Sequence, residues 1–164
     1  MRFKWFVVVV VSIFMLGLSM TGLSGQAFAE EAKPAGKSWP ASVDDVIGKV
    51  KGSVKTIDME AFKKVVDNKG DAIIIDVREP EEYKSGFIPG AINIPRGLAE
   101  FKIWKAVAGF PDKTNTSIKI YTYCAVGGRA VLTAKALQDV GFTDVTAVTI
   151  KMADWVKAGH QVER

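Results

Sequence analysis

Three consecutive isoleucines, at positions 73–75, constrain the fold more than any other feature of this sequence. They stand in the stretch DAIIIDVR (71–78), between charged and turn-forming residues. A strand with one buried face alternates apolar and polar residues, whereas a continuous β-branched run is typical of a strand buried on both faces. Such a strand needs helices on both sides of its sheet, so this stretch predicts an α/β fold with a parallel sheet.

Strand-like and helix-like segments alternate along the chain from residue 54 to residue 159. The patterns predict strands at 54–58, 71–78, 91–95, 117–123 and 145–150. They predict helices at 41–52, 59–70, 79–86, 97–110, 128–141 and 152–159. Strands that alternate with helices imply crossover connections, and therefore a parallel sheet that is covered on both faces.

The first 29 residues are predicted to form a secretory signal peptide rather than part of the fold. Arg2 and Lys4 give a positive start, residues 6–20 are largely apolar, and the AFA pattern at 27–29 is typical of a cleavage site. The alternative is an uncleaved membrane anchor, but the apolar run is short beside the about 20 residues that span a bilayer. Cleavage near Ala29 would place the protein in the periplasm or outside the cell.

The chain that cleavage would leave, residues 30–164, is long enough for one domain and too short for two. We expect a polar linker and an N-terminal helical arm at 30–53, and the folded domain at 54–164. The arm is a packing segment or, alternatively, part of a homodimer contact. Loss of Arg2 and Lys4 from the chain's 22 basic residues leaves 20 against 18 acidic ones. This near-balance of scattered charges argues against a nucleic-acid partner.

Cys124 is the only cysteine, and it follows the strand-like segment SIKIYTY (117–123). An exported chain ordinarily uses cysteines in pairs as disulfides, which one cysteine cannot form within its own chain. Cys124 is therefore either a buried small apolar residue or a reactive thiol. The residues around it decide between these alternatives.

The residues after Cys124 predict an anion-binding loop. In a parallel sheet the ligand site lies beyond the carboxyl ends of the strands, where the helix predicted at 128–141 begins. Backbone N–H groups at a helix N-terminus favour a thiolate. Gly127 and Gly128 allow successive N–H groups to point inward, and Arg129 adds a cation. The alternatives are an ordinary strand-to-helix turn and a solvated or acid-paired arginine.

Two segments, IIIDVREPEEYKSGFIPGAINIP (73–95) and YCAVGGRA (123–130), give the sequence a resemblance to a known family. They are similar, in order and spacing, to the D-V-R-x-x-x-E-[YF]-x-x-G-x-I-x-G-A-x-N-I-P block and the C-x-x-G-x-R loop of single-domain rhodaneses. The resemblance covers about residues 54–160. It implies a three-layer α/β domain with a central, mainly parallel sheet of five strands. It also implies sulfurtransferase activity, in which the cysteine takes a sulfane sulfur from a donor and passes it, as a persulfide, to a thiophilic acceptor.

Carried over by position, the resemblance implies a role for each residue of a small site. Cys124 would be the nucleophile and the persulfide carrier. Backbone N–H groups of the following loop would stabilise the thiolate and the outer sulfur; the loop residues are Ala125, Val126, Gly127, Gly128 and Arg129. Asp76 and Arg78 would hold the loop region by hydrogen bonds and charge pairing without doing chemistry. Glu82 would pair with an arginine or, alternatively, lie on a solvated helical face.

Three departures from the family's pattern bear on the choice of substrate. Ala125 stands where thiosulfate-using members often have arginine, and Val126 follows it, so the loop offers little positive charge to a dianionic donor. Polysulfide or a partner protein's persulfide is therefore at least as plausible a donor as thiosulfate. Phe87 replaces a frequent histidine and is interpreted as core packing. Ile150-Lys151 replaces a glycine pair, and Lys151 is either a cation near the pocket or a solvated residue.

Two other functions are alternatives to a sulfurtransferase. Cysteine-dependent phosphatases and arsenate reductases of the related fold have five residues between cysteine and arginine, whereas four separate Cys124 from Arg129. The shorter ring suits a single sulfur better than a tetrahedral phosphate. A non-catalytic carrier, which sequesters polysulfide and delivers it to a membrane-bound respiratory enzyme, would need the same cysteine in the same loop.

The sequence predicts neither a metal site nor a cofactor. Its one histidine, His160, is expected at the surface, and one cysteine with one histidine supplies no ligand cluster. A general base is not expected near Cys124, because an already ionised thiol needs none. The expected partners are small sulfur compounds, with polysulfide or thiosulfate as donor and cyanide or a thiol as acceptor.

Overall fold

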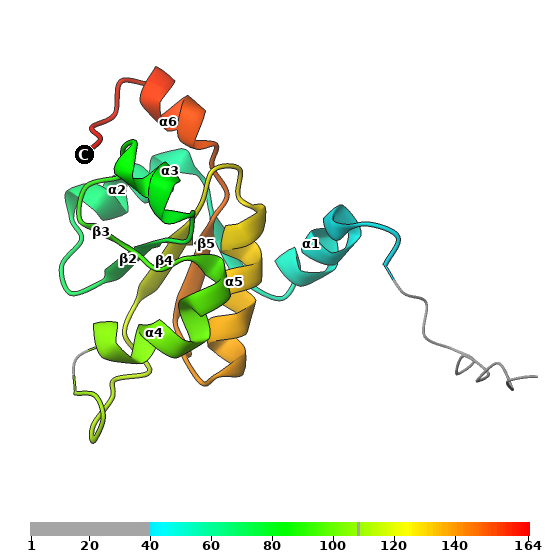
Figure 1. Cartoon of the computed structure of the whole chain (residues 1–164), viewed down its shortest axis with the longest axis vertical. Helices are drawn as coiled ribbons and strands as arrows, with labels where there is room; N and C mark the ends of the chain where they lie inside the picture. The colour runs from blue at the N-terminus through cyan, green and yellow to red at the C-terminus, as the bar shows by residue number, and fades with distance from the viewer. Residues whose placement is uncertain (1–39, 108) are drawn as a thin grey trace, which may run out of the picture. The chain divides into compact units, whose positions relative to one another are not determined.

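The computed structural model describes residues 40–107 and 109–164 of the chain (Figure 1). The predicted signal peptide and most of the predicted linker lie outside these described residues. Within the described part of the chain, no helix combines the length and the apolar character that a membrane span requires.

Five parallel strands form one sheet in the order β1-β5-β4-β2-β3. The strands are β1 (Lys55–Ile57), β2 (Ile73–Asp76), β3 (Ala91–Asn93), β4 (Ile120–Tyr123) and β5 (Val145–Val148). Strand β4 is central in this order, and β3 is at one edge. Because all neighbouring pairs are parallel, the carboxyl ends of the five strands meet at one end of the sheet. The predicted α/β fold with a five-stranded parallel sheet is confirmed.

Helices precede, connect and follow these strands. They are α1 (Val43–Lys51), α2 (Met59–Asp67), α3 (Pro80–Lys84), α4 (Ala99–Ala106), α5 (Gly128–Asp139) and α6 (Met152–Lys157), with a 3-10 helix, η1 (Arg96–Leu98), before α4. Local sequence signals set several helix starts. The Ser42 hydroxyl accepts a hydrogen bond from the Asp45 N–H at 3.2 Å. The Asp58 carboxylate accepts one from the Ala61 N–H at 2.9 Å. Both are N-cap bonds, which satisfy N–H groups that the first turn leaves unpaired.

The isoleucine run serves two apolar cores, one on each face of the sheet. On one face, residues of α4 and α5 pack against strand residues that include Ile75. On the other face, Phe62 of α2 and Trp155 of α6 pack with Ile74. Successive strand residues point to opposite faces, so Ile74 and Ile75 enter different cores. Both are fully buried, which explains why this strand shows no polar alternation.

The helix predicted at 97–110 is shorter in the structure. Its first residues belong to η1, and α4 ends at Ala106. Val107 is already extended, with φ −96° and ψ 133°. Pro111 follows and lacks an N–H donor, and its ring disfavours the helical region for Phe110. Gly109 has φ +88°, outside the right-handed helical region, so together with the extended Val107 and with Pro111 it prevents a helix that continues to Phe110.

The strand predicted at 117–123 pairs with its neighbours only from Ile120 onward. A turn closed by a side-chain hydrogen bond lies at the start of the range predicted as strand, at residues 115–117. The Asn115 carboxamide oxygen accepts a hydrogen bond from the Ser117 N–H at 3.0 Å. Such turns compete with strand pairing, because the amide side chain takes the place of a ladder partner.

Helix α1, which lies in the predicted arm, packs against α5. Ile47 and Val50 of α1 contact the apolar core on this face of the sheet. At Gly128, the first residue of α5, an added Cβ would lie 2.9 Å from Cδ1 of Ile47. A side chain at position 128 would therefore require the Ile47 side chain to move.

Ile75 and Ile92 provide a matched test of the doubly buried strand, because they are register partners on β2 and β3. Ile75 is 0 % exposed and Ile92 is 40 % exposed. We expect Ile75→Ala to lower the free energy of unfolding by about 2–5 kcal/mol, through lost burial and a residual cavity. Ile92→Ala should cost about 1 kcal/mol or less, because part of its surface already meets water. Urea unfolding followed by circular dichroism measures both, and equal losses would contradict the burial of β2 on both faces.

Candidate active site

Cys124 follows β4 directly, at the carboxyl end of the central strand. Residues 125–127 then carry the chain to Gly128, the first residue of α5. The cysteine is fully buried and packs within the core that α4 and α5 cover. The sulfur is thus held between the end of the sheet and the beginning of a 12-residue helix.

The Cys124 sulfur accepts a hydrogen bond from the backbone N–H of Gly127, with 3.1 Å between the nitrogen and Sγ. Gly127 is the N-cap residue of α5, so the sulfur lies at the positive end of the helix dipole. The bond requires φ +89° at Gly127, a conformation that residues with a side chain rarely adopt. The geometry stabilises negative charge on the sulfur, and a thiolate or a persulfide anion would both benefit.

Arg129 and Glu82 form a bidentate ion pair beside this loop. The guanidinium Nη1 and Nη2 atoms donate to the Glu82 carboxylate oxygens at 2.7 and 2.9 Å. The hydrogen bond from Arg129 lowers the pKa of Glu82. The bond to Glu82 raises the pKa of Arg129, and proximity to Cys124 raises it further. The cation of the loop itself is therefore already paired with a carboxylate.

Asp76 and Arg78 form a buried ion pair at the carboxyl end of β2. Arg78 Nη2 donates to Asp76 Oδ2 at 2.6 Å and to the Gly86 carbonyl at 2.8 Å. Among the hydrogen bonds of the described residues, neither side chain bonds to the loop 125–129. The pair holds the turn at Gly86 against the end of β2.

Tyr123 connects this ion pair to the cysteine. The guanidinium carbon of Arg78 lies 5.9 Å from the centre of the Tyr123 ring. The Tyr123 hydroxyl accepts a hydrogen bond from the Ile88 N–H at 3.0 Å, and burial raises the pKa of this phenol. Because Tyr123 directly precedes Cys124, the ion pair lies against the residue before the cysteine and not against the loop 125–129.

The sequence reasoning missed one support of the loop. The Met152 N–H, at the start of α6, donates a hydrogen bond to the Ala125 carbonyl at 2.9 Å. The backbone of Thr149 also lies close, since a Cβ added to Gly127 would be 3.5 Å from its Cα. These contacts involve main-chain atoms, so no side-chain pattern signals them. The Ile150-Lys151 departure leads directly into this contact, and Lys151 is exposed.

The loop presents an apolar side chain to solvent. Val126 is 70 % exposed, while Ala125 is half-buried and Cys124 is buried beneath them. Neither side chain carries charge, so the outer surface of the loop offers backbone N–H groups and methyl groups. A donor that approaches the sulfur here meets little positive side-chain charge.

Phe87 and His160 lie outside the loop, and both contact aromatic side chains. Phe87 packs against the core on the α2 side and stacks on Tyr83 at 4.0 Å between ring centroids, as a packing residue would. His160 was expected at the surface and is instead half-buried, with its ring 4.6 Å from that of Trp155. Within the described residues, no group of three His, Cys, Asp or Glu side chains gathers as a metal site.

The fold and the loop define a class: a parallel α/β domain with a cysteine held at a helix N-terminus after the central strand. Residues 58–158 match the family described as Rhodanese-like domain. The matched segment covers more than half of the chain, and the chain belongs to the rhodanese-like family.

Relatives and solved structures share this domain. YrkF of Bacillus subtilis (strain 168), named a candidate sulfur carrier protein, is 36 % identical over 103 residues, or 63 % of this chain and 51 % of that protein. This chain therefore spans about half the length of that relative. The thiosulfate:glutathione sulfurtransferase of Saccharomyces cerevisiae is 28 % identical over 115 residues, or 65 % of this chain and 81 % of that one.

A solved structure from Rhodopseudomonas palustris CGA009 is similar over a longer stretch. It covers 78 % of this chain and 98 % of its own, with 26 % identity and a TM-score of 0.63. That protein is described as one of unknown function with a suggested tyrosine phosphatase activity. This likeness supports the fold. Sulfur transfer and tyrosine phosphatase activity are distinguished by the loop that follows Cys124.

Glu82→Gln should change how stability depends on pH. The lowered pKa of Glu82 means that its pairing with Arg129 stabilises the fold above the carboxyl's ordinary value of 4.5, and that this contribution is lost as pH falls through the lower, folded value. For a pair this exposed we expect Glu82→Gln to cost about 0.2–1 kcal/mol at pH 7. The cost should shrink as the pH falls below 4.5.

Urea unfolding at several pH values measures this difference. Glu81→Gln is the matched control, because Glu81 lies on the same helix, is exposed, and forms no ion pair with a described residue. A pH-independent cost for Glu82→Gln, or an equal effect of Glu81→Gln, would contradict the role of the ion pair.

Proposed function

We propose that this protein moves a sulfane sulfur from a donor to a thiophilic acceptor through a persulfide on Cys124. The observation that carries the proposal is the 3.1 Å hydrogen bond from the Gly127 N–H to the Cys124 sulfur at the N-terminus of α5. A nucleophilic sulfur needs stabilisation of its anion, and the helix N-terminus supplies it before and after sulfur is loaded. The relatives named as sulfurtransferase and sulfur carrier support the same chemistry.

The reaction has two displacements. The Cys124 thiolate attacks the terminal sulfur of the donor, a sulfur–sulfur bond breaks, and the remainder of the donor leaves with the electron pair. The outer sulfur now carries the negative charge and faces the N–H groups of the loop. An acceptor thiolate or cyanide then attacks this outer sulfur, the bond to Cys124 breaks, and the thiolate is restored. No oxidant or reductant is consumed.

We favour polysulfide, or the persulfide of a partner, over thiosulfate as the donor. Thiosulfate carries two charges on a compact group that is bonded directly to the transferred sulfur, so a cation near the loop helps to bind it. The loop has Ala125 and Val126 at its outer surface, and Arg129 is neutralised by Glu82. Against this stands the yeast relative, which is named for thiosulfate.

A non-catalytic sulfur carrier is the second candidate, and the B. subtilis relative named a candidate sulfur carrier favours it. A carrier and an enzyme would hold Cys124 in the same loop, but only an enzyme would transfer sulfur over many cycles. A phosphatase is less well supported, because four residues between Cys124 and Arg129 form a smaller ring than a tetrahedral oxyanion needs, and Glu82 already occupies the arginine.

We also propose that the protein acts in the periplasm or outside the cell, after cleavage near Ala29. The support is the sequence of the first 29 residues, which lie outside the described structure. In that compartment a membrane-bound respiratory enzyme would be a suitable recipient of sulfur from this protein. Amino-terminal sequencing of the exported protein tests the cleavage.

Turnover with Cys124→Ser tests the proposed function. Purified protein given polysulfide and cyanide should release thiocyanate over many cycles, and Cys124→Ser should reduce release to the uncatalysed rate, because a serine hydroxyl is not a nucleophile here at neutral pH. Intact mass after donor treatment should rise by one sulfur atom in the wild type only. A single stoichiometric burst would favour the carrier, and absence of the persulfide would overturn both.

Val126→Arg tests the argument about the donor. We expect the added cation to lower the KM for thiosulfate by about 5- to 10-fold, and to change the KM for polysulfide less. Val126 is a suitable position because its side chain is 70 % exposed. Val126→Gln is the control for size and polarity without charge. A wild-type protein that strongly prefers thiosulfate at matched sulfane sulfur would contradict the proposed donor.

A further inference from the structure

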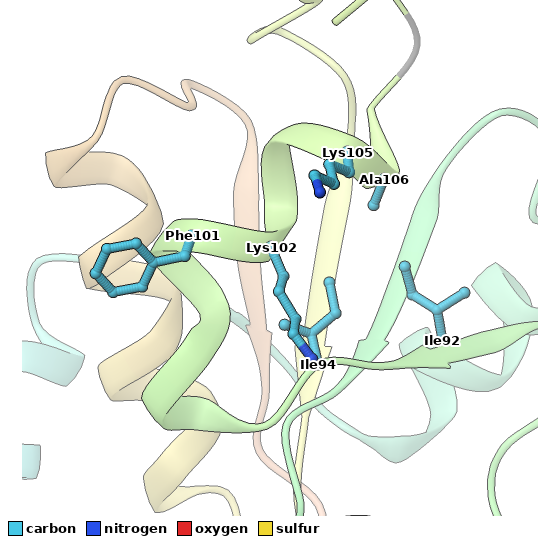
Figure 2. Close-up of a pocket in the computed structure, with 6 residues that line it drawn as sticks. All are labelled: Ile92, Ile94, Phe101, Lys102, Lys105 and Ala106. Atoms are coloured by element: carbon cyan, nitrogen blue, oxygen red, sulfur yellow. The ribbon is translucent and has the colours of Figure 1, made fainter.

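A groove lies between the edge strand β3 and helix α4 (Figure 2). Its volume is about 530 Å³. The residues that line it are Ile92, Ile94, Phe101, Lys102, Lys105 and Ala106. Two isoleucines from the sheet side face the helix, and the two lysines extend from the helix beside them (Figure 2).

The groove exposes apolar surface that the fold itself does not cover. Phe101 is 78 % exposed and Ile92 is 40 % exposed. The Phe101 ring points away from the two isoleucines, so it lies at the rim of the groove (Figure 2). Exposed apolar surface is unfavourable in water, and it commonly marks a site that another molecule covers. Aromatic side chains beside an apolar pocket are the usual centres of such contacts.

The charge beside this apolar surface is of one sign. Lys102 and Lys105 are both exposed, and neither forms an ion pair with another described residue. By contrast, Lys63 and Lys135 pair with aspartates one turn away on their own helices. The surface therefore complements a molecule that presents an apolar group flanked by carboxylates.

The groove also lies close to the candidate active site. Asn93, Asp76 and Tyr123 are register partners across β3, β2 and β4. The pairing continues one residue further, since the Ile94 N–H donates to the Asp76 carbonyl and the Val77 N–H to the Tyr123 carbonyl. Ile94 is thus two strands from Cys124 on the same level of the sheet, which is about 10 Å at the usual strand spacing. Both side chains belong to the same core.

We propose that this groove docks the protein partner with which Cys124 exchanges sulfur, through a partner segment that presents an apolar side chain flanked by carboxylates. The proposal rests on the sulfur-transfer function proposed above. The partner's cysteine then reaches Cys124 across the short distance from Ile94. An extended chain covers about 3.3 Å per residue, so about three to four residues separate the docked apolar side chain from the reacting cysteine.

The sulfur exchange itself needs no further reactant. In one direction, the Cys124 thiolate attacks the outer sulfur of the partner's cysteine persulfide, the sulfur–sulfur bond breaks, and the partner's thiolate leaves. In the other, the partner's thiolate attacks the outer sulfur of the Cys124 persulfide. One sulfur atom moves, and the negative charge passes from the attacking to the leaving thiolate.

Synthetic peptides test the docking directly on the full chain. The acidic probe is a short peptide with a leucine between two aspartates and a cysteine about four residues away. The basic probe has lysines in place of the aspartates. A version of each with serine instead of cysteine measures binding alone by fluorescence anisotropy, and the persulfide forms measure sulfur transfer to Cys124 by intact mass. Wild-type protein should bind the acidic probe at least about 10-fold more tightly than the basic one.

Groove variants and matched controls locate the binding. Lys102→Glu combined with Lys105→Glu should reverse the preference between the two probes, whereas Lys113→Glu combined with Lys119→Glu, an equal charge change before β4, should change binding less than about 2-fold. Phe101→Ala should weaken binding of the acidic probe by about 10-fold. Val43→Ala, also an exposed apolar residue on a helix, should not. Turnover of polysulfide and cyanide should be unchanged in all of these variants.

Several results would overturn the docking site. These are equal binding of acidic and basic probes, equal effects of groove and control variants, and loss of polysulfide turnover in the groove variants. A wild-type dimer that Phe101→Ala converts to a monomer would assign the groove to self-association instead. Binding to phosphatidylglycerol vesicles without a preference between peptides would assign it to lipid. If acidic-probe binding depends on the groove but the persulfide never forms, the docking site stands and the sulfur-transfer function fails.

Discussion

The hydrogen bond from the Gly127 N–H to the Cys124 sulfur is the contact on which the rest of the site depends. It exists because β4 delivers the cysteine to the end of the sheet and α5 begins four residues later. The turn between them needs the positive φ of Gly127, and Gly128 needs the absence of a side chain beside Ile47 of α1. The two glycines therefore have different roles. Gly127 shapes the turn that holds the sulfur, and Gly128 leaves room for Ile47 of the arm.

Charge around the loop is arranged to support an anionic sulfur without attracting a second anion strongly. The helix N-terminus contributes partial positive charge from fixed N–H groups, which act at short range on the sulfur. The full charge of Arg129 is balanced by Glu82, and that of Arg78 by Asp76. Such a site favours an anionic sulfur, whereas a compact dianion finds neither guanidinium free of a carboxylate.

Much of the fold could be predicted from the sequence because its strands are buried on both faces and its helices have local caps. The run that contains Ile74 and Ile75 indicates a strand buried on both faces, and Asp58 indicates the start of α2. The predicted end of α4, at residue 110, was wrong, because the apolar pattern continues past Ala106 while the backbone is already extended at Val107. In the site, the cysteine and the glycines are visible as a pattern in the chain. Contacts made by main-chain atoms, such as that between Met152 and Ala125, leave no such pattern.

The groove beside β3 follows from the same topology that makes the site. A parallel sheet gathers the carboxyl ends of its strands, so the edge strand brings Ile94 to the level of Cys124 without any specialised loop. Helix α4 ends at Ala106, and Ile92 of the edge strand remains 40 % exposed beside it. An edge with exposed apolar side chains two strands from Cys124 is the place at which the proposed partner would bind.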